Sequence, residues 1–285
     1  MSAGLTIKGA MAVVTGAASG IGASLAQALA IRGCGLALAD RDEAGLETVA
    51  AQARTHGVTV STHVLDVADA AQVAALPGAV LAAHGRVSIL VNNAGVALMG
   101  RFEQVPEADF EWLFNINFWG TVRMTRAFLP ALRAVPAAQI VNISSVYGLM
   151  APPGQVAYAA SKFAVRGFSE ALRHELEGST VGVTVVHPGG IRTAIARTAR
   201  VPDTVQPAEA AKGLALFNKL LRTEPDAAAA VIVRGIERRE KRVLIGADAR
   251  PIAALVRLFP VGHWPLIQRL AARAARRPAV KTTHG

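Results

Sequence analysis

Two residues in the second half of the chain have the types and the spacing of a catalytic pair. Tyr158, one of 2 tyrosines among 285 residues, stands four positions before Lys162. Residues at positions i and i+4 of a helix lie on one face, so the phenol and the ammonium group can point the same way. A nearby cation stabilises phenolate and lowers the tyrosine pKa from its ordinary value of about 10, which predicts a general acid/base. Taken alone, such a pair has the alternative interpretation of an exposed helical pair.

A second hydroxyl that can hold a substrate oxygen precedes this pair. Ser145 stands thirteen residues before Tyr158, at the end of an apolar segment that is typical of a strand. Polar side chains at the carboxyl edge of a parallel sheet face the crevice in which ligands bind. Ser145 is therefore predicted to share a site with Tyr158 and Lys162.

The elements that must position these side chains alternate along the chain. Short apolar runs such as AMAVVTG, GLALAD, VSILVNNAG and VGVTVVHPG are separated by alanine-rich segments whose apolar spacing suits helices. Strands that are almost wholly apolar indicate a parallel sheet covered on both faces. The sequence therefore predicts an α/β fold with a single Rossmann-type, doubly wound parallel sheet. We expect one catalytic domain over residues 1–248 and a C-terminal extension over residues 249–285.

A glycine-rich turn follows the first predicted strand. Gly16, Gly20 and Gly22 stand in the segment TGAASGIG, where the strand passes into a helix. Glycines at this point permit tight backbone geometry and let a pyrophosphate approach the free amides of the helix N-terminus. The spacing differs from the usual dinucleotide fingerprint, and an ordinary glycine-rich loop is the alternative.

The second predicted strand ends in an acidic residue. Asp40 is placed to accept hydrogen bonds from both hydroxyls of an adenosine ribose. The alternative is a helix cap for the segment that starts near Asp42. Arg41 offers a cation for a 2′-phosphate, but the carboxylate beside it repels that phosphate. We therefore expect NAD rather than NADP, without excluding NADP.

Six motifs in this order closely resemble those of the short-chain dehydrogenase/reductase family. They are TGAASGIG, NNAG, NINFWG, SSVYG, YAASK and HPGGIRT, and the resemblance runs from about Lys8 to Thr193 and more loosely to Gly246. It implies an oxidoreductase that interconverts a secondary alcohol and a ketone by hydride transfer with NAD(H). The alternatives are an NADP(H)-dependent carbonyl reductase and a non-catalytic dinucleotide-sensing or scaffold protein.

The resemblance implies four catalytic residues. Tyr158 exchanges a proton with the substrate oxygen, and Lys162 lowers the tyrosine pKa and binds the nicotinamide ribose. Ser145, which has the family spacing that its neighbour Ser144 lacks, orients the substrate oxygen. Asn117 supports a water-linked proton relay through Lys162.

The resemblance also implies the residues around the cofactor. Asp66 lies by the adenine, Asn93 to Gly95 lie along the adenosine, and Pro188 to Thr193 surround the carboxamide; Asp66 and Thr193 have the alternative interpretation of caps. Ser19 stands where NADP-preferring relatives often have a basic residue. The full set is Gly16, Ser19, Gly20, Ile21, Gly22, Asp40, Arg41, Asp66, Val67, Asn93, Ala94, Gly95, Tyr158, Lys162, Pro188, Gly189, Ile191 and Thr193. We expect no metal site.

The stretch over about 190–222 corresponds to the variable substrate loop of the family. Two sets of apolar residues favour a lipophilic substrate, although apolar helical stripes are usually core. They are Leu214, Phe217, Leu220 and Leu221 in this loop, and Leu149, Met150, Pro152 and Pro153 after the catalytic serine.

The C-terminal extension departs from the family pattern. In PLIQRLAARAARR a helix would place arginines on one face and apolar residues on another. The arginines are Arg269, Arg273, Arg276 and Arg277, and the apolar residues are Leu266, Ile267, Leu270 and Ala274. Such a segment suits the surface of an anionic membrane. The alternative is a helix packed on the enzyme or on a neighbouring subunit, ending in a disordered tail.

Charge and composition bound the partners and the location. The formal net charge is +10, and no acidic residue follows Asp248. Because seven positive charges lie in the extension, the rest of the chain has an ordinary balance and nucleic acid is an unlikely partner. Cys34 is the single cysteine, and the N-terminus lacks the features of a signal peptide. We expect a cytoplasmic protein with peripheral membrane contact as an option, forming a homodimer or homotetramer.

Overall fold

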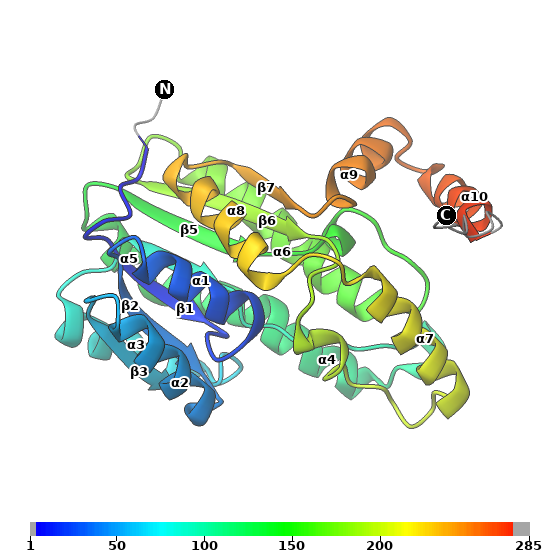
Figure 1. The fold of residues 1–285 in the computed structure, drawn as a ribbon, viewed down its shortest axis with the longest axis horizontal. Coiled ribbons are helices and arrows are strands. Elements are labelled where there is room, and N and C mark those ends of the chain that lie inside the picture. The colour runs from blue at the N-terminus through cyan, green and yellow to red at the C-terminus, as the bar shows by residue number, and fades with distance from the viewer. Residues whose placement is uncertain (1–3, 276–285) are drawn as a thin grey trace, which may run out of the picture.

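Seven parallel strands form one sheet in the computed structural model, which describes residues 4–275 (Figure 1). The order across the sheet is β3-β2-β1-β4-β5-β6-β7. The strands are β1 (Met11–Thr15), β2 (Gly35–Asp40), β3 (Val60–Val64), β4 (Ile89–Asn92), β5 (Ala138–Ile143), β6 (Val181–Pro188) and β7 (Arg242–Ile245). The prediction of a doubly wound parallel sheet is confirmed.

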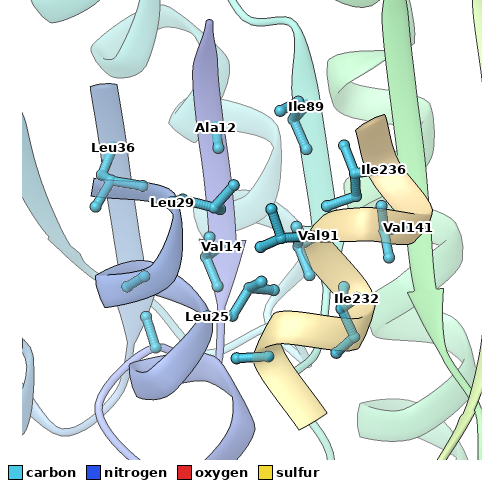
Figure 2. Close-up of a cluster of buried hydrophobic side chains, with 14 of the residues drawn as sticks. Ala12, Val14, Leu25, Leu29, Leu36, Ile89, Val91, Val141, Ile232 and Ile236 are labelled. Atoms are coloured by element: carbon cyan, nitrogen blue, oxygen red, sulfur yellow. The ribbon is translucent and has the colours of Figure 1, made fainter. Parts of the chain in front are cut away.

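Helices cover both faces of this sheet. One face carries α1 (Gly20–Ala30), α2 (Glu43–Arg54) and α8 (Pro225–Glu237), and the other carries α3 (Ala70–His84), α5 (Gly120–Arg133) and α6 (Val156–Glu175). Figure 2 shows the first interface, in which Leu25 and Leu29 of α1 and Ile232 of α8 pack on the strands. Burial of these side chains supplies the main stabilisation of the fold, at roughly 2 kcal/mol for each leucine or isoleucine.

The remaining helices gather toward one end of the sheet (Figure 1). They are α4 (Glu107–Phe114), which continues through a π-helical turn η2 (Asn115–Trp119) into α5, and then α7 (Pro207–Leu220), α9 (Ala249–Leu258) and α10 (His263–Ala275). Short 3₁₀ turns occur at η1 (Phe102–Gln104), η3 (Val146–Gly148) and η4 (Ala194–Ala196). No helix of residues 4–275 combines the length and the apolar character that a membrane crossing needs.

The strand order fixes where a ligand can bind. The chain leaves β1 in one direction toward β2 and β3, and later continues from β4 in the other direction, so the order reverses between β1 and β4. Open α/β sheets bind ligands outside the carboxyl ends of their strands at this point. The glycine turn after β1 and Ser145 after β5 both lie at that edge.

Candidate active site

A cavity of about 770 Å³ lies at the carboxyl edge of the sheet. It is lined by every residue that the sequence analysis predicted for catalysis or cofactor binding except Gly22 and Asn117. Segments from the whole chain therefore meet in one place, from the glycine turn near the N-terminus to α10 near the C-terminus.

The glycine turn has the backbone geometry that its sequence predicts. Gly16 and Gly20 have φ values of 64° and 55°, a region that other residues rarely adopt. A Cβ on Gly22 would lie 2.0 Å from the carbonyl oxygen of Gly16, so only glycine lets α1 begin so close to the strand. Gly22 thus permits the close packing of the turn on α1 and does not line the cavity.

The first turn of α1 faces the cavity with free backbone donors. Ser19 is the residue before α1, and among the described residues its side chain makes no capping hydrogen bond. The first N–H groups of a helix have no partner within the helix, and together with the helix dipole they favour an anion. Asn93 braces this turn, because its Nδ2 donates at 3.0 Å to the carbonyl oxygens of Thr15 and Gly16.

Asp40 is tied to the glycine turn and does not cap the next helix. Its Oδ2 accepts from the backbone N–H of Ala18 and its Oδ1 from that of Asp42, both at 3.1 Å. Asp42 is the residue that caps α2, through a hydrogen bond from the N–H of Gly45. The interpretation of Asp40 as a helix cap is therefore wrong. Arg41 lies beside it on the same cavity wall.

Asp66 and Thr193, which are predicted to lie by the adenine and the carboxamide, make no side-chain cap of a helix among the described residues. Asp66 accepts from the N–H of Ala68 at 2.8 Å, whereas the cap of α3 is Asp69. Thr193 precedes η4, and its side chain makes no capping hydrogen bond within the part of the chain described. Both side chains line the cavity.

Ser145, Tyr158 and Lys162 line one wall of the cavity. Ser145 lies just beyond β5 at the start of η3, where its Oγ accepts from the N–H of Tyr147 at 3.1 Å. Tyr158 and Lys162 occupy successive turns of α6, and the Lys162 Nζ lies 5.7 Å from the centre of the Tyr158 ring. Both side chains are buried, so the interpretation of an exposed helical pair is wrong.

Two hydrogen bonds fasten α6 to the end of β5. The Nζ of Lys162 donates to the carbonyl oxygen of Ile143 at 3.1 Å, and the Oγ of Ser144 donates to the carbonyl oxygen of Lys162 at 2.8 Å. Both serines line the cavity, but the hydroxyl of Ser144 is engaged with the backbone of α6, whereas that of Ser145 accepts from the N–H of Tyr147. The assignment of Ser145 rather than Ser144 as the catalytic serine stays a prediction from the family resemblance, which did not foresee the hydrogen bond of Ser144.

Burial sets the protonation states of the pair. Burial raises the pKa of Tyr158 to about 12, although the hydroxyl of Ser145 acts in the opposite direction. Burial also lowers the pKa of Lys162 to about 8. The predicted net lowering of the tyrosine pKa is not found, because desolvation disfavours the phenolate more than its neighbours favour it. At neutral pH the phenol is protonated.

Asn117 lies beneath this wall in the π-helical turn. Its Oδ1 accepts from the N–H of Val96 at 2.8 Å, and its Nδ2 donates to the carbonyl oxygen of Val96 and to the Oγ of Ser161. A Cβ on Gly95 would lie 3.1 Å from this Oδ1 and 3.4 Å from the Lys162 Nζ, so all three groups are close. The Oδ1 of Asn115, two positions earlier in the same turn, accepts a hydrogen bond from the Nη1 of Arg123 at 2.7 Å.

His187 was missed as a site residue. It is fully buried at the end of β6, and its Nδ1 donates to the carbonyl oxygen of Ser145 at 2.9 Å. Its Nε2 is buried without a partner among the described residues, and burial lowers the histidine pKa to about 4. A neutral imidazole thus fixes the backbone of Ser145. A histidine ahead of PGG was visible in the sequence, but its partner forty-two positions earlier was not.

The C-terminal extension contributes unpredicted residues to the cavity. Ile252 of α9, Trp264 and Ile267 of α10, and Asp248 before α9 line it.

The expected apolar residues Met150, Pro152, Leu220 and Leu221 line the cavity too, whereas Leu149, Pro153 and Leu214 are absent from the lining. The side chains of Phe217, Leu270, Arg273 and Ala274, and all of residues 276–285, lie outside what the structure describes. No group of three His, Cys, Asp or Glu side chains in the described ranges is arranged to hold a metal ion.

Comparison with known proteins places this fold and site in a family. Residues 10–203 match the family model described as short chain dehydrogenase. A curated relative, the putative oxidoreductase SadH of Mycobacterium tuberculosis, is 42% identical over 92% of this chain and 95% of its own length. The dehydrogenase/reductase SDR family protein 7-like of Anopheles gambiae is 34% identical over 94% of this chain and 84% of its own.

Solved structures agree with the sequence relatives. A short chain dehydrogenase/reductase from Burkholderia phymatum, in complex with NAD, superposes with a TM-score of 0.83 and 32% identity over 90% of this chain and 95% of its own. The chain belongs to the short-chain dehydrogenase/reductase family and is an oxidoreductase of that family.

The buried imidazole of His187 predicts a loss of stability in acid. Its pKa is 6.5 in the unfolded chain and about 4 in the folded chain, so between these values only the unfolded chain binds the proton. The contribution is fully present above pH 6.5 and is lost as the pH falls toward 4. Wild type should lose up to about 3 kcal/mol more unfolding free energy over this range than His187→Asn, which keeps a donor but does not titrate.

Urea unfolding at a series of pH values measures this difference. His56→Asn makes the same replacement at an exposed histidine and should follow the wild-type profile. Parallel profiles for wild type and His187→Asn would show that the imidazole is accessible to protons in the folded state.

Proposed function

We propose that the protein interconverts a secondary alcohol and a ketone on a lipophilic substrate, with NAD(H) as the hydride carrier. One observation carries the proposal: the hydroxyls of Ser145 and Tyr158 and the ammonium group of Lys162 line the same cavity as the glycine turn. The residues proposed for proton transfer and the turn proposed to bind an anion thus border the same cavity.

The residues present fit a dinucleotide. A Cβ on Gly20 would lie 3.1 Å from the Cγ2 of Thr193, so a side chain at position 20 would fill the gap between the turn and the opposite wall. The free amides at the start of α1 suit a pyrophosphate, and Asp40 suits a ribose. The remaining walls of the dinucleotide site would come from Asp66 to Val67, Asn93 to Gly95, and Pro188 to Thr193.

The side chains of this chain would manage the proton. The bound nicotinamide would supply or accept the hydride. Tyr158, protonated at neutral pH, would donate its hydroxyl proton to a carbonyl oxygen during reduction, and its phenolate would accept a proton during oxidation. The Ser145 hydroxyl would orient the substrate oxygen, and the Lys162 ammonium would stabilise the phenolate. Asn117 would hold the backbone at Val96 and support proton exchange near Lys162.

The substrate side of the cavity favours an apolar molecule. Its walls include Met150, Ile195, Leu221, Ile252 and Trp264. Ligand sites that are mainly apolar with a few polar groups take their affinity from burial and their orientation from the polar groups. A lipophilic alcohol would place its hydroxyl on Ser145 and Tyr158 and its hydrocarbon part against these residues.

The carboxylate at the end of β2 supports NAD over NADP. Asp40 is held toward the glycine turn by the N–H of Ala18, and a 2′-phosphate at the ribose would meet its negative charge. Ser19 supplies no cation at the turn, and the Burkholderia phymatum relative is described in complex with NAD. Arg41, beside Asp40 in the cavity lining, favours the phosphate instead.

Removal of the Tyr158 hydroxyl tests the catalytic assignment. Tyr158→Phe should lower kcat by about 10² to 10⁴, because the positioned proton donor is lost. NADH binding, followed by fluorescence titration, should be retained. Tyr147→Phe removes the hydroxyl of the other tyrosine, whose ring lies 6.2 Å away, and should cost less than about tenfold. Near-normal turnover of Tyr158→Phe would refute the assignment.

Side-by-side titration of NADH and NADPH at fixed salt tests the cofactor assignment. Wild type should bind NADH at least about tenfold more tightly, since one repelled charge costs on the order of 1.4 kcal/mol. Asp40→Ser should reduce or reverse this ratio by weakening NADH binding and admitting the phosphate. Glu43→Gln removes a carboxylate from an exposed position three residues later and should leave the ratio unchanged. A wild-type preference for NADPH would mean that Arg41 outweighs Asp40.

We also propose that the protein is a homodimer or homotetramer. Trp119, Val156 and Phe163 are 48%, 41% and 39% exposed on the adjoining elements η2 and α6. Exposed aromatic and aliphatic side chains on neighbouring elements suit a subunit interface. Sedimentation equilibrium should give two or four times the chain mass of 29.6 kDa, and Phe163→Glu should shift the mass downward. A wild-type mass of one chain would contradict the proposal.

A further inference from the structure

The α9–α10 arm, residues 249–269, has one face on the cavity. Ile252, Trp264 and Ile267 line the cavity from α9 and α10. The arm is fastened at its base by Asp248, whose Oδ2 accepts from the N–H of Gly190 at 3.3 Å. It lies beyond the residues that match the family model, and Figure 1 shows it extending past the end of the sheet, on the side where α7 also lies. This arm therefore forms part of the wall around the substrate space.

The tip of the arm is exposed and apolar. Leu258, Phe259 and Val261 are 71%, 48% and 91% exposed, and Pro260 and Gly262 between and after them are exposed as well. Of the other exposed large apolar side chains in the described part of the chain, Trp119, Val156 and Phe163 belong to the proposed subunit contact and the rest are far apart in the sequence, whereas these three stand within four positions. Contiguous exposed apolar side chains mark sites of interaction with proteins or membranes.

Exposed cations lie along the same arm. Arg250 and Arg257 are exposed on α9, where a spacing of seven residues puts them on one face, and Arg269 is exposed on α10. No acidic residue follows Asp248 anywhere in the sequence. Two copies of the same basic surface would repel each other, so a second copy fits this face poorly. Nucleic acid would satisfy the arginines but would leave the apolar tip in water.

An anionic lipid surface satisfies both features. Apolar side chains enter the boundary between headgroups and acyl chains, while arginines pair with anionic headgroups. We propose that the tip of the α9–α10 arm, residues 258–262, docks the mouth of the active-site cavity on an anionic membrane. The substrate then passes from the bilayer along the apolar inner face of the arm. The second statement rests on the proposed function, and the first does not.

Vesicle co-sedimentation of the full chain tests the docking. Wild type should bind vesicles of phosphatidylglycerol and phosphatidylcholine, less at high salt, and should bind pure phosphatidylcholine weakly. The variant Leu258→Ser/Phe259→Ser/Val261→Ser should bind anionic vesicles at least about tenfold more weakly, since three apolar side chains no longer enter the lipid. Arg250→Gln and Arg257→Gln should each cost about fivefold on the same vesicles. Phe102→Ser, which changes a 72% exposed side chain elsewhere, is the matched control and should bind as wild type.

Several outcomes would overturn the docking proposal. Equal vesicle binding by the wild type and the triple variant would exclude the tip. Absence of wild-type binding, together with a smaller sedimentation mass of the triple variant, would identify the tip as a subunit contact. Salt-dependent co-sedimentation with duplex DNA in place of vesicles would identify a nucleic-acid surface.

Rates on two alcohols, one dissolved in buffer and one held in vesicles, distinguish an effect on substrate delivery from an effect on the chemical step. The triple variant should keep the wild-type rate on a short secondary alcohol dissolved in buffer and lose most of its rate on a long-chain secondary alcohol held in anionic vesicles. Equal loss on both alcohols, or on neither, would refute delivery from the bilayer. Tyr158→Phe should still bind vesicles. The docking test therefore gives a result even if the catalytic assignment of Tyr158 fails.

Discussion

The attachment of α6 to the end of β5 is the interaction on which the site depends. The Lys162 ammonium group donates to the carbonyl oxygen of Ile143, and the Ser144 hydroxyl donates to the carbonyl oxygen of Lys162. These bonds join a helix and a strand at the one place where Tyr158 and Ser145 must meet. His187 adds a third fastening by donating to the carbonyl oxygen of Ser145. Each bond is buried, so the loss of either partner would leave an unsatisfied polar group, at a cost of about 1 to 3 kcal/mol.

Burial also determines how the pair can act. Desolvation raises the pKa of Tyr158 and lowers that of Lys162, so the two groups are each pushed toward their neutral forms. A phenol that is hard to ionise holds its proton until a partner takes it, and a lysine with a pKa of about 8 still carries its charge at pH 7 in most molecules. The arrangement therefore keeps a proton donor and a cation side by side in a medium of low polarity, where electrostatic stabilisation of a phenolate is strong.

The sequence alone predicted what depends on local spacing and failed where tertiary burial decides. Alternation of apolar runs and helices predicts the parallel sheet, and the four-residue spacing of Tyr158 and Lys162 places both on one helix face. The direction of the tyrosine pKa was wrong because spacing reports a neighbouring charge but not desolvation. The cap interpretation of Asp40 failed because Asp42, two positions later, takes that role. Ile252 and Trp264 reach the cavity from roughly ninety to over one hundred residues beyond Tyr158, a closeness that no local pattern encodes.

The apolar character of the α9–α10 arm has one physical reason at the cavity and another at the tip. Ile252, Trp264 and Ile267 are half-buried where they line the cavity, so ordinary folding accounts for their apolar character. Val261 is 91% exposed and contributes almost nothing to any core, so the stability of the folded chain does not account for an apolar residue there. A polar tip would serve the fold equally well and would be better hydrated. The apolar side chains of the tip are stabilised only when another apolar phase covers them. The arginines on the same arm favour a phase that carries anionic groups at its boundary.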